Sequence, residues 1–414
     1  MSRLDELIQE LCPDGVEYKT LGEIAVDIYR GAGITRDQVT AEGTPCVRYG
    51  EIYTTYGVWF DKCVSHTDES KLLSKKYFEH GDILFAITGE SVDDIAKCCV
   101  YIGHEKCLAG GDIVVLKHNQ NPKYLSYALA TTDARQQKSK GKVKSKVVHS
   151  SVPAIREIKV PVPPIEIQRE IVRILDNFTN LTAELTAELT ARKTQYAYYR
   201  DNLLTTKPQW NHVKILDMLS QPITDGPHTT PQFVQNGVPF ISVDSIWDGK
   251  IHFEKRRGYI TEEFDEECCK KYKPQKNDVY MVKSGSTTGK VAFVDTDIRF
   301  NIWSPLAAMR VNEKNSARFL FYLLQTERVQ KQVKSKSSHG SQPNLGMREL
   351  EQFEVDIPPL DVQNRIVNVL DNFEKICSDL NIGLPAEIEA RQKQYEYYRD
   401  KLLSFKEHKN ELSD

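Results

Sequence analysis

The chain has 414 residues, enough for two or three domains of ordinary size. Hydrophobic residues make up 40% of it and charged residues 27%, which excludes collagenous, disordered and small disulfide-stabilised proteins. The 55 Lys and Arg against 58 Asp and Glu give a formal charge of −3. A protein that is basic over its whole surface is therefore excluded, whereas local basic surfaces are not.

The sequence patterns typical of a membrane span, a signal peptide and a metal site are weak. The mean hydropathy is −0.48 and no apolar run approaches the ~18 residues of a membrane span. Acidic residues interrupt the first eight positions, where a signal peptide would be apolar, so we expect a cytoplasmic protein. The nine cysteines are odd in number and include no Cys-x-x-Cys, which predicts reduced thiols. The cluster Cys98, Cys99, His104 and Cys107 matches no common zinc spacing, and we expect no metal site.

An internal repeat organises the chain. Residues 162–178 return as 357–373, at an offset of 195, with identical or chemically similar residues at most positions. Residues 196–204 return as 395–403, at an offset of 199. Weaker matches pair residues 43–48 with 237–242 and residues 124–129 with 319–324. Identity this dense indicates a tandem duplication whose two halves share a scaffold and differ in surface.

Short β-branched or aromatic runs bounded by Gly or Asp predict strands near 82–87, 112–116, 278–282 and 291–294. One helix is expected near 122–136 and its counterpart near 316–332. Apolar residues spaced by three or four from Ile167 to Leu203 predict one long amphipathic helix over about 165–205. The second block has the same spacing from Val362 to Leu380, and Gly383 and Pro385 predict a stop and a new first turn there.

These elements predict an α+β fold in which a mixed, strand-rich domain and a long helix occur twice. Because a long amphipathic helix needs a partner for its apolar stripe, we expect the two helical blocks to pair as an antiparallel coiled-coil rod. The predicted domains are 1–164, a central helix 165–206, a second domain 207–359 and a C-terminal helical block 360–414.

Catalytic motifs are weak or missing. Residues 285–290 (Gly-Ser-Thr-Thr-Gly-Lys) are one residue shorter than a P-loop and lack its Ser or Thr after the lysine, which favours a glycine turn between strands. Asn121-Pro122-Lys123-Tyr124 resembles the Asn-Pro-Pro-Tyr of adenine methyltransferases but lacks the second proline, which favours a helix start. We predict no catalytic residue and interpret the chain as a binding protein.

Basic segments are more informative. Lysines at 138, 140, 142, 144 and 146 alternate without an intervening acid, and Lys331, Lys334 and Lys336 occupy the corresponding place in the second half. A solvated loop is the alternative, but the recurrence favours paired basic loops that bind DNA phosphates. Lys255-Arg256-Arg257 is either a further basic patch or a plain surface turn. The candidate DNA contacts are Arg48, Tyr49, Lys138, Lys140, Lys142, Lys144, Lys146, Ser242, Lys334, Lys336, Ser338, His339, Gln342 and Asn344.

The helical blocks resemble a known family. Two variable domains, each followed by Pro-Pro-x-x-x-Gln and a helix ending in Tyr-x-Tyr-Tyr-Arg-Asp-x-Leu-Leu, look like the specificity subunit of type I restriction–modification systems. Residues 181–189 carry the Thr-Ala-Glu-Leu tandem of one branch of that family, and residues 11–17 and 21–24 resemble its usual opening. The resemblance covers the whole chain, is specific in the helical blocks and is weak inside the variable domains.

The resemblance implies that each variable domain reads one half of a bipartite, asymmetric DNA site. It implies two adenine-N6 methyltransferase subunits as partners, with nuclease–translocase subunits added for restriction. S-adenosylmethionine, ATP and Mg²⁺ would belong to those partners, with no cofactor in this chain. The candidate partner contacts on the helices are Phe178, Tyr196, Tyr199, Phe373, Tyr395 and Tyr398.

Two alternatives come from other classes of protein. A catalytic adenine methyltransferase would bind its cofactor as an isolated chain, and the missing glycine-rich loop counts against it. A coiled-coil adaptor would bind proteins through its two domains, and the recurring lysine runs count against that. Salt-dependent binding to DNA would separate the adaptor from a DNA-recognition subunit.

Overall fold

The computed structural model describes residues 2–140, 147–205, 207–338, 342–378 and 383–408. The chain folds into two compact units. Unit 1 joins Met1–Glu184 to Ile388–Asp414, and unit 2 is Leu185–Glu387. None of the helices in the described ranges is long and apolar enough to cross a membrane.

Unit 1 is built on two five-stranded sheets. The order in the first sheet is β2 (Ala25–Arg30), β12 (Ile113–His118), β8 (Ile83–Ala86), β10 (Cys98–Tyr101) and β5 (Trp59–Phe60). The order in the second is β3 (Val39–Thr40), β6 (Ser65–Thr67), β4 (Thr44–Val47), β11 (Cys107–Ala109) and β7 (Tyr77–Phe78). Two short pairs complete it, β1 (Tyr18–Thr20) with β14 (Lys159–Pro161) and β9 (Thr88–Gly89) with β13 (Val148–His149).

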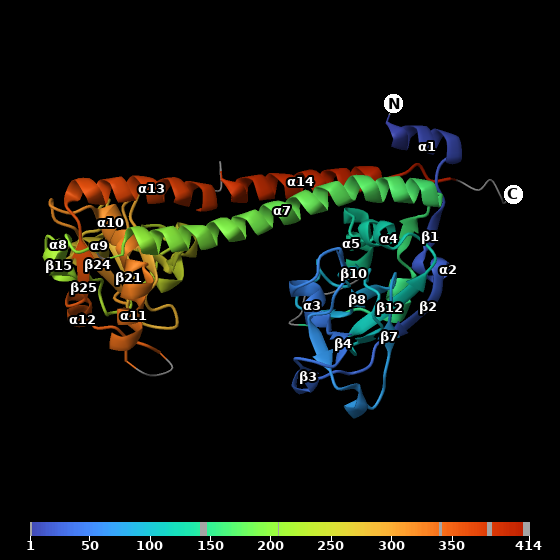
Figure 1. Cartoon of the computed structure of the whole chain (residues 1–414), viewed down its shortest axis with the longest axis horizontal. Helices are drawn as coiled ribbons and strands as arrows, with labels where there is room; N and C mark the ends of the chain where they lie inside the picture. The colour runs from blue at the N-terminus through green and yellow to red at the C-terminus, as the bar shows by residue number, and fades with distance from the viewer. Residues whose placement is uncertain (1, 141–146, 206, 339–341, 379–382, 409–414) are drawn as a thin grey trace. The chain divides into compact units, whose positions relative to one another are not determined.

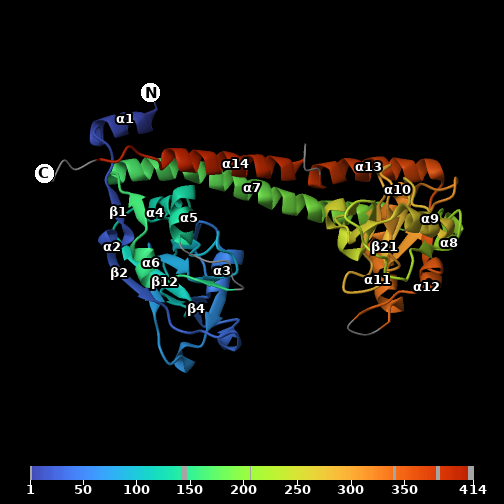
Figure 2. The same ribbon diagram turned by 180° about the vertical axis from the view of Figure 1, so that it is seen from behind.

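The helices of unit 1 are α1 (Arg3–Leu11), α2 (Leu21–Ile24), α3 (Tyr49–Thr54), α4 (Pro122–Ala128), α5 (Thr132–Ser139), α6 (Val152–Arg156), the first half of α7 (Ile165–Leu203) and most of α14 (Leu384–Leu402). Two 3₁₀ turns, η1 (Arg36–Gln38) and η2 (Glu69–Lys71), lie among the strands. Helices α4 and α5 lie between the sheets and α7 in both views (Figures 1 and 2).

Unit 2 repeats this plan with fewer strands. Its main sheet has the order β16 (Thr224–Asp225), β24 (Leu306–Met309), β21 (Val279–Val282) and β22 (Val291–Phe293), and a second sheet has β20 (Gly258–Ile260), β17 (Val238–Ile241) and β23 (Asn301–Ile302). The short pairs are β15 (Asn211–Lys214) with β25 (Glu354–Ile357) and β18 (Ile246–Trp247) with β19 (Lys250–Ile251). The helices are α8 (Ile215–Met218), α9 (Glu262–Lys271), α10 (Ala317–Leu324), α11 (Glu327–Lys336), α12 (Met347–Glu351) and α13 (Leu360–Ser378), with 3₁₀ turns η3 (Val243–Ser245) and η4 (Phe253–Lys255).

The central strands are buried on both faces, because alternate side chains enter different cores. In β8, Ile83 and Phe85 face the helices, whereas Leu84 and Ala86 face the second sheet. In β21, Val279 and Met281 face the helices, and Tyr280 and Val282 enter the opposite core. The strands predicted from the sequence are confirmed, as is the α+β fold class.

The prediction of one helix near 122–136 and one near 316–332 is wrong. Each is two helices, because a threonine hydroxyl starts a new helix within the run. Thr131 accepts a hydrogen bond from the amide of Ala134, and Thr326 accepts one from the amide of Val329. The predicted helix start at Asn121 is confirmed, since its side chain caps the amide of Tyr124.

The two segments that end the repeats exchange units. In unit 1, Ile171 and Leu175 of α7 share a core with Tyr395 and Leu403 from the end of the chain. In unit 2, Leu370 of α13 packs with Tyr196 and Leu203, which come after the first repeated block. Each globular domain is therefore completed by the closing segment of the other repeat, which agrees with the antiparallel pairing of the helical blocks predicted from the sequence.

Candidate nucleic-acid interface

The lysine run of the first half does not form one exposed loop. Lys138 lies in α5, is 7% exposed, and donates a hydrogen bond to the carbonyl oxygen of Leu129 at 2.8 Å. The prediction that it contacts phosphate is wrong, because a buried ammonium with an internal acceptor is not offered to a ligand. Lys140 is exposed at the end of the helix. Lys142, Lys144 and Lys146 lie outside the described residues.

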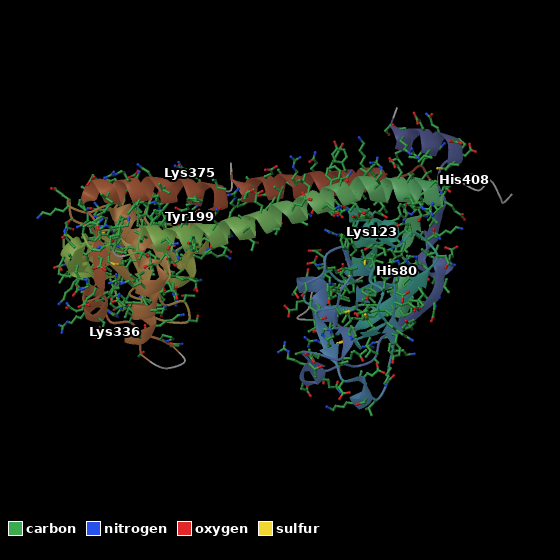
Figure 3. The ribbon with its side chains drawn as sticks, in the orientation of Figure 1. His80, Lys123, Tyr199, Lys336, Lys375 and His408 are labelled. Carbon is green, nitrogen blue, oxygen red and sulfur yellow. The ribbon has the colours of Figure 1, made fainter. Side chains whose placement is uncertain are left out.

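The corresponding lysines of the second half lie on a helix and not in a loop. Lys331, Lys334 and Lys336 belong to α11, and Lys331 forms an ion pair with Glu327 at 2.8 Å. Lys334 and Lys336 are exposed, and Lys336 lies on the side of unit 2 away from α13 (Figure 3). The prediction of two equivalent basic loops is therefore wrong, while these two lysines stay available to a phosphate backbone.

Beyond α11 the chain returns beside a glycine turn. Asn344 forms an isolated β-bridge with Ser284, and the amide of Gly285 donates to the carbonyl oxygen of Pro343 at 3.0 Å. The hydroxyl of Ser338 accepts from the amide of Asn344 at 3.0 Å. The turn 285–290 joins β21 to β22, as predicted, and it lies beside three of the candidate base contacts, Ser338, Gln342 and Asn344. His339 lies outside the described residues.

Unit 1 has the same arrangement, which the sequence predictions missed. Strand β13 pairs with β9, so that His149 lies opposite Thr88, and Nδ1 of His149 is 3.2 Å from the hydroxyl of Thr88. His149 is exposed. It precedes Asn344 by the repeat offset of 195 residues, and this offset could have identified His149 as the counterpart of Asn344 from the sequence. His149 is therefore an added candidate for contact with bases.

The remaining candidate DNA contacts differ in accessibility. Arg48 precedes α3, is half-buried, and lies 3.4 Å from Glu51, whereas Tyr49 is 39% exposed. Ser242 is 3% exposed, so the prediction that it contacts DNA is wrong. The loop after β17 folds back over this residue, and the hydroxyl of Ser245 there donates to the carbonyl oxygen of Lys255.

The basic patch at 255–257 is organised by aromatic rings. The guanidinium of Arg256 lies 4.2 Å from the centre of the Tyr259 ring, and that of Arg257 lies 3.7 Å from the Trp303 ring. Cation–π contacts at such distances restrain an exposed arginine without neutralising it. This segment thus remains a positively charged surface of unit 2.

The aromatic residues predicted to bind partners pack within the chain. Phe178 stacks on Tyr398 in unit 1 with ring centres 5.4 Å apart, and Tyr199 stacks on Phe373 in unit 2 at the same separation. Figure 3 shows Tyr199 on the side of α7 that faces α13. These contacts hold the helices of each unit together, so neither phenylalanine is a free docking residue.

Tyr395 is 5% exposed in the core of unit 1 and Tyr196 packs on the core of unit 2, so the prediction that they contact a partner is also wrong. The tyrosines of this motif that face solvent most are Tyr198, 66% exposed, and Tyr397, 62% exposed, while Tyr199 is 40% exposed beside its contact with Phe373. They occupy equivalent positions in the two copies. The helical spacing predicted the stripe, but its accessible edge depends on how the helices pack.

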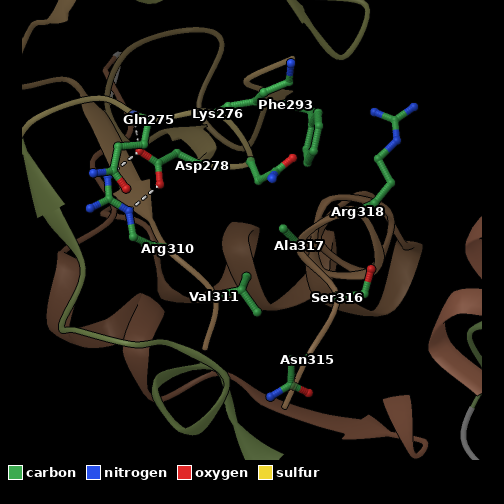
Figure 4. A pocket seen from close by; sticks show the side chains of 11 residues that line it. Gln275, Lys276, Asp278, Phe293, Arg310, Val311, Asn315, Ser316, Ala317 and Arg318 are labelled. Carbon is green, nitrogen blue, oxygen red and sulfur yellow. Dashed lines mark hydrogen bonds and ion pairs between the residues drawn. The ribbon is translucent and has the colours of Figure 1, made fainter. Parts of the chain in front are cut away.

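A cavity of about 420 Å³ in unit 2 is lined by several charged side chains (Figure 4). The charges at one end neutralise each other: Arg310 donates to both carboxylate oxygens of Asp278 at 2.8 Å, and the hydroxyl of Tyr272 donates to the same carboxylate. Pairing with Asp278 raises the pKa of Arg310. A closed ion pair of this kind positions β21 and offers no free acid, base or nucleophile.

Over the described part of the chain, no three His, Cys, Asp or Glu side chains cluster as a metal site requires. Cys98, Cys99 and Cys107 are buried in strands, and burial raises the pKa of Cys99 well above its usual value. The Cys99 thiol is therefore a poor nucleophile and a poor metal ligand. All three cysteines pack as small apolar residues in the cores of unit 1.

Comparison with known proteins agrees with this geometry. Residues 13–192 and 209–390 each match the type I restriction modification DNA specificity domain. The EcoR124I/EcoR124II specificity subunit of Escherichia coli is 35% identical over 263 residues, which cover 60% of this chain and 63% of that protein. The match therefore spans less than two thirds of that relative. A Mycoplasma pneumoniae protein described as a putative type I specificity subunit is 31% identical over 60% of this chain and 94% of its own length.

Two solved structures share the fold. The specificity subunit of a type I restriction–modification system from M. genitalium matches 94% of this chain and 96% of its own with a TM-score of 0.50 and 13% identity. A chain from a structural study of type I complex assembly and conformational transition matches 95% of this chain and 98% of its own, with a TM-score of 0.61 and 19% identity. The chain belongs to the type I restriction–modification DNA specificity family and contains two copies of its domain.

Proposed function

We propose that this chain is the DNA-recognition subunit of a type I restriction–modification complex, with one half of a bipartite, asymmetric site read by each unit. The observation that carries the proposal is that one scaffold bears two different surfaces. The segment that pairs beside the central sheet presents His149 in unit 1 and Asn344 in unit 2. Different side chains at the same place favour different half-sites.

The family recognises DNA and does not catalyse, and the chemistry is therefore assigned to partners. We infer that two adenine methyltransferase subunits bind, one at each exposed tyrosine, because Tyr198 and Tyr397 recur at equivalent positions of the repeat. Large exposed aromatic side chains are typical of protein interfaces. S-adenosylmethionine, ATP and Mg²⁺ then belong to the methyltransferase and restriction subunits, and the complex acts in the cytoplasm.

The Thr-Ala-Glu-Leu tandem at 181–189 is proposed to set the number of unread base pairs between the half-sites. The segment lies within α7, whose helix is continuous from Ile165 to Leu203. A change in its length would alter the rise and rotation of the helical residues after it. We propose on the same residues that the chain belongs to the branch of the family that carries such repeats.

The test is adenine-methylation mapping of host DNA with and without the gene. The expected result is one bipartite motif that disappears with the gene. Cofactor binding by the isolated chain would favour a methyltransferase instead, and a lack of salt-dependent DNA binding would favour a protein-binding adaptor. Either outcome would overturn the proposal.

A further inference from the structure

A buried carboxylate in unit 2 holds three basic side chains. Asp225 ends β16 and is fully buried. Its Oδ1 accepts a hydrogen bond from Lys271 of α9, while its Oδ2 lies 3.2 Å from Nζ of Lys283 and 3.5 Å from Nε2 of His228. Within the described ranges, Oδ2 has no donor with hydrogen-bond geometry. These four residues form the Asp225 cluster.

Two of the three basic groups of the Asp225 cluster reach solvent although their anchor does not. The side chain of Lys271 is 53% exposed and that of His228 is 74% exposed, whereas Lys283 is 14% exposed. The two ammonium groups exceed the single carboxylate by one positive charge. A buried carboxylate that organises lysines at the surface thus leaves a net attraction for an anion.

The backbone before His228 is held in place by close packing. A Cβ at Gly226 would lie 1.8 Å from the carbonyl oxygen of Ile302, so only glycine allows this close approach to β23. The amide of Ser304 donates to the carbonyl oxygen of Pro227 at 3.3 Å. His228 therefore comes directly after a turn that is held against the second sheet.

The cluster adjoins the candidate base contacts. Lys283 immediately precedes Ser284, which pairs with Asn344. The carbonyl oxygen of Lys283 accepts a hydrogen bond from the amide of Leu345 at 2.7 Å. A phosphate bound at Lys283 would therefore lie close to the segment expected to face the bases. Phosphate contacts at such places fix the register of a protein on the duplex.

Unit 1 has no such anchor at the matching position. Arg30 pairs with Val114 of β12, and Asp225 pairs with Ala307 of β24. On their other side, Val114 and Ala307 pair with the central strands β8 and β21. Arg30 and Asp225 therefore occupy the same place in the two sheets. Arg30 is exposed and forms an ion pair with Asp112 at 2.6 Å. The cluster is thus a feature of unit 2 and not of the shared scaffold.

We propose that Lys271, Lys283 and His228 form a DNA phosphate site on unit 2, and that Asp225 is its positioning residue. This inference rests on the proposed function. A lysine already held by a buried carboxylate loses less side-chain freedom on binding than a free surface lysine. A purely structural ion cluster, in which the lysines only neutralise the buried carboxylate, is the competing interpretation.

The salt dependence of DNA binding separates these interpretations. The full chain is titrated against a labelled duplex that carries the mapped site, over a series of KCl concentrations. For Lys271→Ala we expect the slope of log affinity against log salt to fall by about 0.9, and the affinity near 0.1 M salt to fall roughly eightfold. Lys271→Arg should keep the wild-type slope, because arginine also binds phosphate.

Lys270→Ala is the matched control. Lys270 is the neighbouring residue on α9 but pairs with Glu267, so its removal should leave the slope unchanged. A slope for Lys271→Ala equal to that of wild type would overturn the phosphate site. Absence of DNA binding by the wild-type chain would instead overturn the proposed function, so the two failures are distinguishable.

Asp225→Asn tests the positioning role through the sign of the effect. The substitution removes one negative charge, so a carboxylate that merely lowers the surface potential predicts tighter DNA binding. A positioning carboxylate predicts weaker binding and a smaller slope, because the basic side chains lose their anchor. Tighter binding would overturn the positioning role. If this variant does not fold, Lys271→Ala still decides the site, since its side chain is half exposed.

Discussion

Gln168 accepts a hydrogen bond from the backbone amide of Asn121 at 2.9 Å, and this contact joins the long helix of unit 1 to its globular domain. The same side chain is buried and donates to the carbonyl oxygen of Pro163 at 2.8 Å. Gln363 repeats both contacts in unit 2, with the amide of Ser316 and the carbonyl oxygen of Pro358, each at 2.9 Å. The glutamine of the repeated Pro-Pro-x-x-x-Gln motif thus connects the long helix to the globular domain in each unit.

The first prediction concerns the hydrogen bonds of these two glutamines. Gln168→Ala should lower the free energy of unfolding of unit 1 by about 2 kcal/mol, because a half-buried amide and a buried carbonyl both lose their partners. Hydrogen exchange should rise in unit 1 and stay unchanged in unit 2, with the reverse for Gln363→Ala. Equal exchange in both units for either variant would contradict the assignment. Gln136→Ala, on the exposed face of α5, is the control.

The second prediction separates two lysines of one run. Lys138→Ala should destabilise unit 1 by roughly 1–3 kcal/mol, because the carbonyl oxygen of Leu129 loses its donor, and should leave the salt slope of DNA binding unchanged. Lys140→Ala should leave stability unchanged and lower the slope by about 0.9, because the exposed Lys140 is expected to contact one phosphate. A lower slope for Lys138→Ala would show that this side chain leaves its buried position on DNA.

The third prediction concerns the methyltransferase partners. Tyr198→Ser and Tyr397→Ser should each remove one of two bound partner subunits, and the double variant should remove both without unfolding the chain, since both rings are largely exposed. Native mass spectrometry of the co-expressed proteins measures this directly. Recovery of the complete complex from the double variant would exclude these tyrosines. Phe178→Asp should instead destabilise unit 1, because Phe178 stacks on Tyr398.

The fourth prediction concerns the Thr-Ala-Glu-Leu tandem. Inserting one unit after Leu189 lengthens the helix by ~6 Å and rotates the remainder of the helix by ~40° beyond a full turn. One base pair of duplex rises ~3.4 Å and turns ~35°. We expect unchanged half-sites and a spacer longer by one base pair in a methylation map. Inserting two residues turns the apolar stripe by ~200° and should destroy assembly. An unchanged spacer after the four-residue insertion would show that this helix does not set the length of the spacer.

The fifth prediction concerns pH. Burial lowers the pKa of His118 to about 4, and its Nδ1 accepts from the amide of Gln120 at 3.1 Å. Between this value and the unfolded pKa of about 6.5, the unfolded chain binds the proton more tightly, so stability is retained above that window and lost as pH falls through it. Unit 1 should lose about 1–2 kcal/mol between pH 7 and pH 5. His118→Gln should flatten this dependence, and an unchanged profile would contradict the assignment.

Local pattern in the amino-acid sequence was enough to establish the duplication, the strands and the long helices. Identity between residues 162–178 and 357–373 needs no structure to be seen, and the periodicity of α7 reflects a local geometry that every turn repeats. The glycine turn and the helix start at Asn121 were also local, because a few adjacent residues decide both. For the same reason the family was recognisable from the helical blocks alone.

The availability of individual side chains, in contrast, depends on tertiary packing. Lys138 and Lys140 are two residues apart in one basic run, yet one is buried against Leu129 and the other is exposed. Tyr395 is buried whereas Tyr397 faces solvent, although both belong to one motif. Spacing defines a stripe on a helix, but its burial depends on segments that pack there from elsewhere in the chain. Which residues of the closing segments are buried in each unit also depends on contacts between residues that are far apart in the sequence.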